Sequence, residues 1–365
     1  MPRRGIATGA AIALLATLTA CLGAGSAPAT SAARTRQALG FNNEAEVVMG
    51  TLTAPPTRRF LTRIKRGKMA GVLFLGNDWL TRSKVKHITT QLQHAACTRG
   101  EPLLIALDQE GGIVKRLAWA PPTEAPADMK SPTDAHAQAA ATAGALAQSG
   151  IDIDFAPVVD TPHAANNFLG SRAFSHKRKW NASMGKAFVR GLQQNGIAAT
   201  TKHFPGLGLA GGNTDNGEIT IKASAAKIEA DFLPFQTAIK AGVKLVMVNT
   251  AIYPHLDAAR NPAAFSSKII NGILREQLGF KGVTVTDSLT APAPSRIPDA
   301  ATKAMLAGSD LLIWGAESAA EQGYATLFHD APGSAALRAR LAEASGRIRA
   351  LKTWLTAHGG PSCSS

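Results

Sequence analysis

Short apolar runs alternate with longer amphipathic segments along most of this chain, and this alternation limits the fold more than any other feature. Several runs are β-branched and apolar on both faces, as strands of a buried parallel sheet are. The runs are Glu46–Met49, Gly71–Leu75, Leu103–Leu107, Ile151–Phe155, Ile197–Thr201, Lys244–Val248, Gly282–Val285 and Asp310–Ile313. Their alternation with helices predicts an α/β fold, a single-domain (β/α)8 barrel of the TIM type, with a doubly wound open sheet as the alternative.

The segments between the runs carry helix signals. The clearest are Ser131–Gln148, Lys177–Gln194, Ser224–Ala241, Ser266–Gln277 and Pro298–Leu306. Several of these segments are followed by a glycine, the residue that most often takes the left-handed conformation after a helix. The predicted C-cap glycines are Gly150, Gly196, Gly242 and Gly308.

The first residues have the pattern of an export signal. Arg3 and Arg4 precede the apolar stretch Ala7–Ala20, which is too short to cross a bilayer as a stable helix. Leu-Thr-Ala before Cys21 is similar to a bacterial lipobox, in which the cysteine is lipidated; an ordinary signal with a chance cysteine is the alternative. We expect a signal peptide over 1–21, a flexible tether over 22–40, the barrel over 41–358 and a tail over 359–365. The predicted protein is secreted and lipid-anchored on the outer face of the cytoplasmic membrane.

The net charge is strongly positive. Lys and Arg number 39 against 25 Asp and Glu, a formal charge of +14, which becomes 37 − 25 = +12 without Arg3 and Arg4. A nucleic-acid site normally combines clustered cations with stacking aromatics, but here only 5% of residues are aromatic and most cations are scattered. For an exported protein we therefore expect an anionic membrane or cell-wall surface as partner, and no nucleic acid. The oligomeric state is left open, with a monomer favoured.

Three cysteines are too few for a disulfide scaffold, and none belongs to a Cys-x-x-Cys metal motif. Cys97 and Cys363 remain after removal of the signal and could pair in an oxidising compartment, but the sequence does not show whether they meet. No metal and no other cofactor is expected.

Polar residues gather where the predicted strands end, which in a TIM barrel is the functional face. They are Asp108 and Glu110 after the third run, Asp160 after the fourth, Lys202 and His203 after the fifth, Asn249 after the sixth and Asp287 after the seventh. Converging carboxylates with a lysine and a histidine suit recognition of a polyol and its hydrolysis. A Gly-x-Gly-x-x-Gly match at Gly206–Gly211 continues into more loop instead of a helix, so no nucleotide site is predicted.

Several blocks carry a family resemblance. They are Asp108-Gln109-Glu110-Gly111-Gly112, Ile153–Val158, Gly170–Phe174, Lys202-His203-Phe204-Pro205-Gly206, Leu278–Val283 and Thr286-Asp287. Over roughly residues 40–320 the chain resembles family-3 glycoside hydrolases of the bacterial exo-β-N-acetylglucosaminidase type. The resemblance implies retaining hydrolysis of terminal β-linked N-acetylglucosamine from cell-wall glycans through a covalent glycosyl-enzyme.

The resemblance also implies roles for individual residues. Asp287 matches the family nucleophile. Four other residues match those that hold the hydroxyls of the terminal sugar, namely Asp108, Arg172, Lys202 and His203. Asn249, at the end of the sixth run, is expected to bind substrate with them.

The chain departs from the family where the general acid/base should lie. Relatives continue Lys-His-Phe-Pro-Gly with His-Gly and then carry Asp-Ser-His on a mobile loop; here Leu207 replaces the first histidine and Gly217 the last. Asp215 keeps the position of the dyad aspartate, and Ile113 replaces a usual arginine. Either Asp215 or Glu218 supplies the proton, or the protein is a degenerate sugar-binding lipoprotein with weak or no turnover. A family-3 β-glucosidase is less favoured, because those enzymes generally take their acid/base from a second domain.

Overall fold

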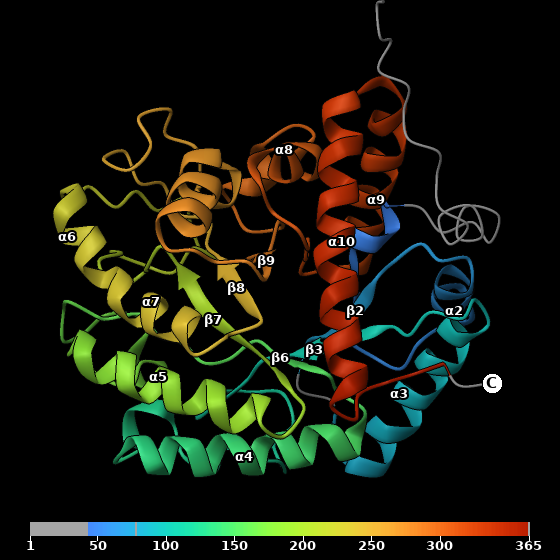
Figure 1. Cartoon of the computed structure of the whole chain (residues 1–365), viewed down its shortest axis with the longest axis horizontal. Coiled ribbons are helices and arrows are strands. Elements are labelled where there is room, and N and C mark those ends of the chain that lie inside the picture. The colour runs from blue at the N-terminus through green and yellow to red at the C-terminus, as the bar shows by residue number, and fades with distance from the viewer. Residues whose placement is uncertain (1–42, 77–78, 364–365) are drawn as a thin grey trace, which may run out of the picture.

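The computed structural model describes residues 43–76 and 79–363, and its main sheet consists of parallel strands hydrogen-bonded in chain order (Figure 1). These strands are β1 (Met49–Leu52), β2 (Gly71–Phe74), β3 (Leu104–Leu107), β6 (Ile153–Asp154), β7 (Ala198–Phe204), β8 (Leu245–Val248) and β9 (Val283–Thr286). The eighth predicted run is reduced to two parallel bridges, from Leu311 to Val285 and from Leu312 to Val48. Because these bridges join β9 to the start of β1, the sheet closes on itself, which confirms the predicted barrel and excludes the open sheet.

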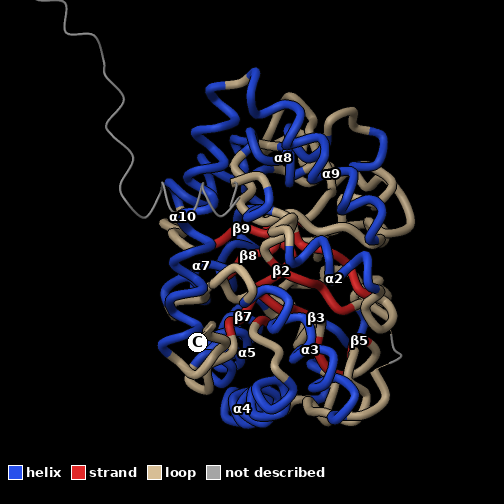
Figure 2. Tube along the Cα trace, turned by 90° about the vertical axis from the view of Figure 1, so that its right-hand side faces the viewer, coloured by secondary structure: helices blue, strands red, loops and turns tan. Residues whose placement is uncertain are grey.

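Helices surround the strands, as Figure 2 shows with helices in blue and strands in red. They are α2 (Arg58–Lys65), α3 (Arg82–Cys97), α4 (Pro132–Ser149), α5 (Arg178–Gln193), α6 (Ala225–Glu229), α7 (Leu233–Lys240), α8 (Ala300–Ala307), α9 (Glu317–Asp330) and α10 (Ala335–Ala357), with a π-helix at Lys268–Gln277. Short 3-10 turns are Ala45–Val47, Pro126–Asp128, Gly170–Arg172, Ala230–Phe232, Ala263–Phe265, Pro294–Arg296 and Ala331–Gly333. β4 (Gln109–Gly111) and β5 (Val114–Lys115) form a small antiparallel hairpin after β3.

Several predicted boundaries differ from the structure; β7, for example, continues to Phe204 and so includes Lys202 and His203. The first apolar run starts as a 3-10 turn, and β1 begins only at Met49. The segment predicted over Ser224–Ala241 is divided into α6 and α7, because Pro234 has no N–H to donate and therefore stands in the first turn of a new helix. Gly150 and Gly308 are confirmed as C-cap residues, with φ of +74° and +117°. Gly196 and Gly242 also have positive φ, +81° and +82°, but they lie after the C-cap residues Gln194 and Ala241.

Both ends of the described chain lie at the base of the barrel, where the strands begin. The turn that contains Glu46 leads into β1, and Glu46 pairs with Arg349 of α10 at 2.8 Å. Cys97 and Cys363 form a disulfide with their Cα atoms 5.2 Å apart, which ties the segment after α10 to the end of α3. The predicted signal, Cys21 and the tether lie outside the described residues. Within the described ranges, no helix is long and apolar enough to span a bilayer.

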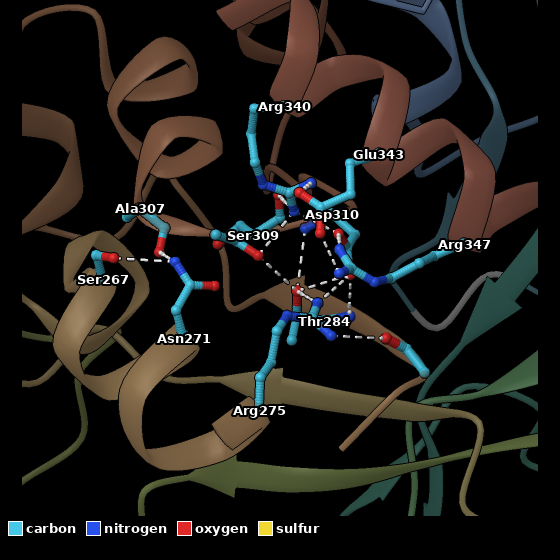
Figure 3. A network of polar contacts seen from close by, with 12 residues as sticks. Ser267, Asn271, Arg275, Thr284, Ala307, Ser309, Asp310, Arg340, Glu343 and Arg347 are labelled. Atoms are coloured by element: carbon cyan, nitrogen blue, oxygen red, sulfur yellow. Dashed lines mark hydrogen bonds and ion pairs between the residues drawn. The ribbon is translucent and has the colours of Figure 1, made fainter. Parts of the chain in front are cut away.

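A buried aspartate at the base fastens the outer helices to the barrel. Figure 3 shows Asp310, directly before the last strand position, among three guanidinium groups. Arg275 lies 2.5 Å and Arg347 2.9 Å from its carboxylate, and Arg340 also pairs with it. The Thr284 N–H of β9 donates to the same carboxylate at 2.9 Å. One fully buried charge therefore links β9, the π-helix and α10.

Replacement of Asp310 with Asn is expected to lower the free energy of unfolding by about 3 kcal/mol, because it leaves buried guanidinium groups without their counter-charge. Urea denaturation measures the loss. The matched control is Glu343→Gln, since the Glu343 side chain pairs with Arg340 and Arg347 but is 54% exposed. That control is expected to cost under about 1 kcal/mol, and equal losses for the two variants would contradict the account.

Candidate functional site

A cavity of about 380 Å³ opens where the parallel strands end. Its polar lining is Asp108, Glu110, Arg116, Arg172, Lys202, His203, Asn213, Thr214, Asp215, Asp287, Ser288 and Thr290. Apolar side chains of β2, β8 and the surrounding loops complete it: Leu73, Leu75, Val114, Phe168, Leu207, Met247, Ala291, Ile313 and Trp314. Most of the predicted site residues are thus brought together, but Asn249 and Glu218 are not among those that line the cavity.

Lys202 lies at the centre of a charge network on the floor. Its Nζ is 2.7 Å from Asp108 Oδ1 and 2.6 Å from Glu110 Oε1, and only 2% of its side chain is exposed. Arg172 donates to both oxygens of Glu110, at 2.8 and 2.9 Å, and Arg116 lies 3.4 Å from Asp108. Neutralised carboxylates with fixed geometry of this kind are suited to hydrogen-bond the hydroxyls of a sugar.

The network controls the ionisation of its carboxylates. Burial would raise the pKa of Asp108, but Lys202 and Arg116 outweigh burial and hold that pKa at about 2. Burial likewise opposes ionisation of Glu110, and Lys202 and Arg172 nevertheless lower its pKa below the ordinary value. Both groups are therefore charged hydrogen-bond acceptors at neutral pH.

Glu110 has a place in the network that sequence reasoning did not give it. Its carboxylate is fully buried and pairs with both Lys202 and Arg172, two of the predicted sugar ligands. The sequence showed this acidic residue two positions after Asp108, but not that the short strand β4 turns its side chain inward. Glu110 therefore fixes the cations that are predicted to hold the sugar.

Asp287 stands directly after β9, at the rim of the cavity. Its Oδ1 accepts the Ser288 N–H at 2.7 Å. Burial raises the pKa of Asp287, and the nearby Asp215 raises it further, whereas His203 and Lys202 lower it. The Asp287 carboxylate is therefore close enough to interact electrostatically with Lys202 and His203 and also with Asp215.

The loop from Leu207 to Glu218 is packed closely against the barrel at its start. A Cβ at Gly208 would lie 1.7 Å from the Thr161 carbonyl oxygen, so only glycine fits there. Further on, Asn213 accepts the Asp215 N–H at 3.0 Å, and the exposed Asp215 lines the cavity. Glu218 is also exposed, but it is not among the residues that line the cavity.

Asn249 lies beneath the cavity floor and is fully buried. Its amide donates to the His203 carbonyl oxygen at 2.9 Å and to the Tyr253 hydroxyl at 2.7 Å, and its Oδ1 accepts the Ala251 N–H at 2.9 Å. Tyr253 in turn donates to the Gly206 carbonyl oxygen at 2.9 Å. In this arrangement Asn249 holds the backbone that carries His203, and its polar atoms face protein instead of the cavity.

Two buried aspartates on either side of Ile153 have strongly altered ionisation. Asp152 accepts the Ile105 N–H and Asp154 accepts the Gln109 N–H, each at 2.9 Å. Asp154 Oδ2 has no hydrogen-bond partner among the residues that the structure describes. Burial raises the pKa of each aspartate to about 8.

These raised pKa values predict a pH dependence of stability. Below the ordinary aspartate pKa both states are protonated; as the pH rises toward about 8, the unfolded chain loses these protons while the folded chain keeps them. Stability from the two groups is therefore lost as the pH rises from about 4 to 8. Urea denaturation between pH 5 and 8 should show a shallower decline for Asp154→Asn than for the unchanged protein. An identical decline would contradict the assignment.

Comparisons with known proteins identify the family of the chain. The model of the glycosyl hydrolase family 3 N-terminal domain matches residues 47–350. A protein described as an uncharacterized secreted glycosyl hydrolase of Arthroderma benhamiae is 34% identical over 84% of this chain and 90% of its own length. A β-hexosaminidase of Xanthomonas oryzae is 35% identical over 66% of this chain and 73% of its own.

Solved structures give the same picture. The β-N-acetylhexosaminidase of Beutenbergia cavernae superposes with a TM-score of 0.79 at 30% identity, covering 85% of this chain and 97% of that one. A family-3 β-N-acetylglucosaminidase of Paenibacillus has a TM-score of 0.81 at 28% identity, covering 88% of this chain and 64% of that one. Among residues 43–76 and 79–363, no group of three or more His, Cys, Asp or Glu side chains is placed to hold a metal ion.

Proposed function

The chain belongs to glycosyl hydrolase family 3 and is a glycoside hydrolase of the β-N-acetylhexosaminidase-like kind, and from this premise we propose that it removes terminal β-linked N-acetylglucosamine from cell-wall glycans. The observation that carries the proposal is the meeting of Asp287 with the Asp108, Lys202 and Arg172 network in one cavity. At about 380 Å³ the cavity is at the small end of ligand pockets, which suits a single terminal ring.

In the proposed reaction, the Asp287 carboxylate attacks the anomeric carbon while the bond to the leaving oxygen breaks and that oxygen takes a proton. The resulting glycosyl ester is attacked by water, which gives its proton to a base and returns Asp287 as a carboxylate. Two inversions leave the anomeric configuration unchanged. Asp108, Arg172, Lys202 and His203 hold the ring hydroxyls and strengthen their hydrogen bonds as the ring distorts.

Asp215 is our candidate for the general acid/base. It lines the cavity with Asp287, and its charge raises the pKa of Asp287, so the two carboxyl groups lie close enough to influence one another. Glu218, the other candidate from the sequence, does not line the cavity. Asp215→Asn should therefore slow hydrolysis of substrates with poor leaving groups, and Glu218→Gln should leave it normal; the reverse result would exchange the two assignments.

A second candidate function is sugar binding with weak or no turnover. The observation that favours it is Gly217, which cannot transfer a proton, at the position of the family's acid/base histidine. In this case the floor network would still bind the sugar, because none of its residues depends on the loop.

The test is an assay of aryl N-acetyl-β-glucosaminide hydrolysis beside the α-anomer and an aryl β-glucoside. Release from the β-N-acetylglucosaminide alone, with the β-anomer of N-acetylglucosamine as the first product by NMR, is expected. No release, combined with calorimetric binding of N-acetylglucosamine, would establish the second candidate instead. An inverted first product would eliminate the covalent route.

We further propose that the protein is held at the cell envelope by a lipid on Cys21, near an anionic membrane or wall surface. The described chain enters the barrel at its base, the end opposite the cavity, so an anchor on that side would leave the cavity facing away from the membrane. Detergent phase partition should move Cys21→Ser from the detergent phase to the aqueous phase. Equal partition of both forms would refute the anchor.

A further inference from the structure

Asp160 is a buried carboxylate under the candidate active site that the proposed reaction does not use. It is 1% exposed and lies in the loop after β6. Its Oδ2 accepts the His203 Nδ1–H at 2.6 Å and the His203 backbone N–H at 3.1 Å, and its Oδ1 accepts the Leu207 N–H at 2.7 Å. Since Asp160 Oδ2 accepts the His203 backbone N–H as well, the ring nitrogen is the donor at this contact, and the imidazole carries a proton on Nδ1.

The other edge of the same imidazole faces the cavity. His203 lines the cavity with 7% of its side chain exposed, and its Nε2 lies 3.4 Å from Arg172 Nη2. Because His203 also lowers the pKa of Asp287, the direction in which its ring points matters both for the sugar and for the nucleophile.

The contact with Leu207 extends the influence of Asp160 to the loop that carries Asp215. Leu207 is buried and begins this loop, and the next residue, Gly208, is pressed against the Thr161 carbonyl oxygen. The first turn of the loop is therefore fixed to residues 160 and 161.

We propose that Asp160 is a positioning residue that turns His203 Nε2 into the cavity and anchors the start of the acid/base loop with the same carboxylate. This inference rests on the proposed function of the cavity. Asp160 would then hold both the His203 side chain and the start of the loop that carries Asp215, so a substitution of Asp160 should affect both.

A second buried aspartate–histidine pair, Asp231 and His163, lies outside the cavity lining and serves as a control. Asp231 accepts from His163 Nε2 at 2.6 Å and is 4% exposed, much like Asp160. Asp231 also lies 3.2 Å from Arg178, and neither Asp231 nor His163 lines the cavity. Loss of a buried pair should therefore lower stability in both places, but only the Asp160 pair should change the reaction.

Charged groups surround both Asp287 and His203. Asp287 is influenced by Lys202 and His203 from β7 and by Asp215 from the loop. His203 meets Asp160 on one edge and Arg172 on the other, and Arg172 is held by Glu110. A change at Asp160 therefore reaches Asp287 through His203.

The experiment is the pH profile of kcat/KM for an aryl N-acetyl-β-glucosaminide. In Asp160→Asn the His203 ring loses its fixed orientation and stabilises the Asp287 carboxylate less. The acidic limb of the kcat/KM profile should therefore move upward by about one pH unit, and KM should rise. Asp231→Asn should leave the limb in place. In a His203→Gln background, Asp160→Asn should cause no further shift. An unmoved limb in Asp160→Asn, or the same shift in Asp231→Asn, would overturn the proposal.

An NMR measurement separates this inference from the proposed function. A hydrogen-bonded imidazole Nδ1–H resonance, assigned by its absence in His203→Gln, is expected in the unchanged protein and in Asp231→Asn, and it should vanish in Asp160→Asn. If the protein has no turnover, the hydrolase proposal fails while this resonance still reports on the pair. Absence of the resonance from the unchanged protein refutes the inference, whether or not Asp160→Asn folds.

Discussion

Asp287→Asn is expected to lower kcat on an aryl N-acetyl-β-glucosaminide by about 10⁴-fold or more, a loss typical of removing an enzyme's nucleophile. The amide has nearly the size of the carboxylate but cannot form the glycosyl ester, and it offers no negative charge to the oxocarbenium-like transition state. An activated aryl leaving group needs little help from a proton, so the loss should appear even if the acid/base of this chain is weak.

The same substitution should leave the fold intact, which separates a chemical effect from unfolding. Burial raises the pKa of Asp287, so its ionised form is disfavoured in the folded protein, and a neutral amide should leave the thermal midpoint equal or higher. Asp299→Asn is the matched control, since Asp299 is exposed and does not line the cavity. Activity that survives in Asp287→Asn would exclude this residue as the nucleophile, and so would an equal loss in Asp299→Asn.

The barrel and the general position of the site were predictable because both depend on short-range patterns. Buried strands between amphipathic helices give the closed sheet, and parallel strands bring their carboxyl ends to one face, so Asp108, Lys202 and Asp287 had to lie near one another. The rule locates the backbone, however, and not the direction of a side chain. Asn249 ends its strand at the expected place, yet its amide points beneath the floor.

What the sequence could not provide was the pairing of charges distant along the chain. Glu110 and Asp160 were visible as acidic residues at strand exits, but their partners Arg172 and His203 are 62 and 43 positions away. Asp310 resembled only the start of a strand, and its role depends on arginines of α10 that pack against it from 30 and 37 positions further on. Cys97 and Cys363 meet across 266 positions, which no local pattern reports.

Gly217→His is expected to raise kcat/KM for substrates with poor leaving groups by between about 10² and 10⁴-fold, the usual contribution of a general acid. A Cβ at residue 217 would meet no atom of the described chain within 4 Å, and Gly217 does not have a positive φ, so the backbone accepts a side chain there. The new imidazole would stand two residues after Asp215, the spacing of the aspartate–histidine pair in relatives of this type.

The comparison of two leaving groups makes this prediction specific. A phenyl glycoside, whose leaving oxygen needs a proton, should be hydrolysed faster by Gly217→His, whereas a dinitrophenyl glycoside should change little. Gly211→His is the matched control, because residue 211 lies in the same loop and is equally open to a Cβ, but it stands four residues before Asp215 instead of two after it. A gain on both substrates, or a gain in Gly211→His, would point to a general effect of histidine on the loop. No gain on the phenyl glycoside would mean that the loop of this chain does not bring residue 217 to the glycosidic oxygen, and Asp215 would then have to act without a partner.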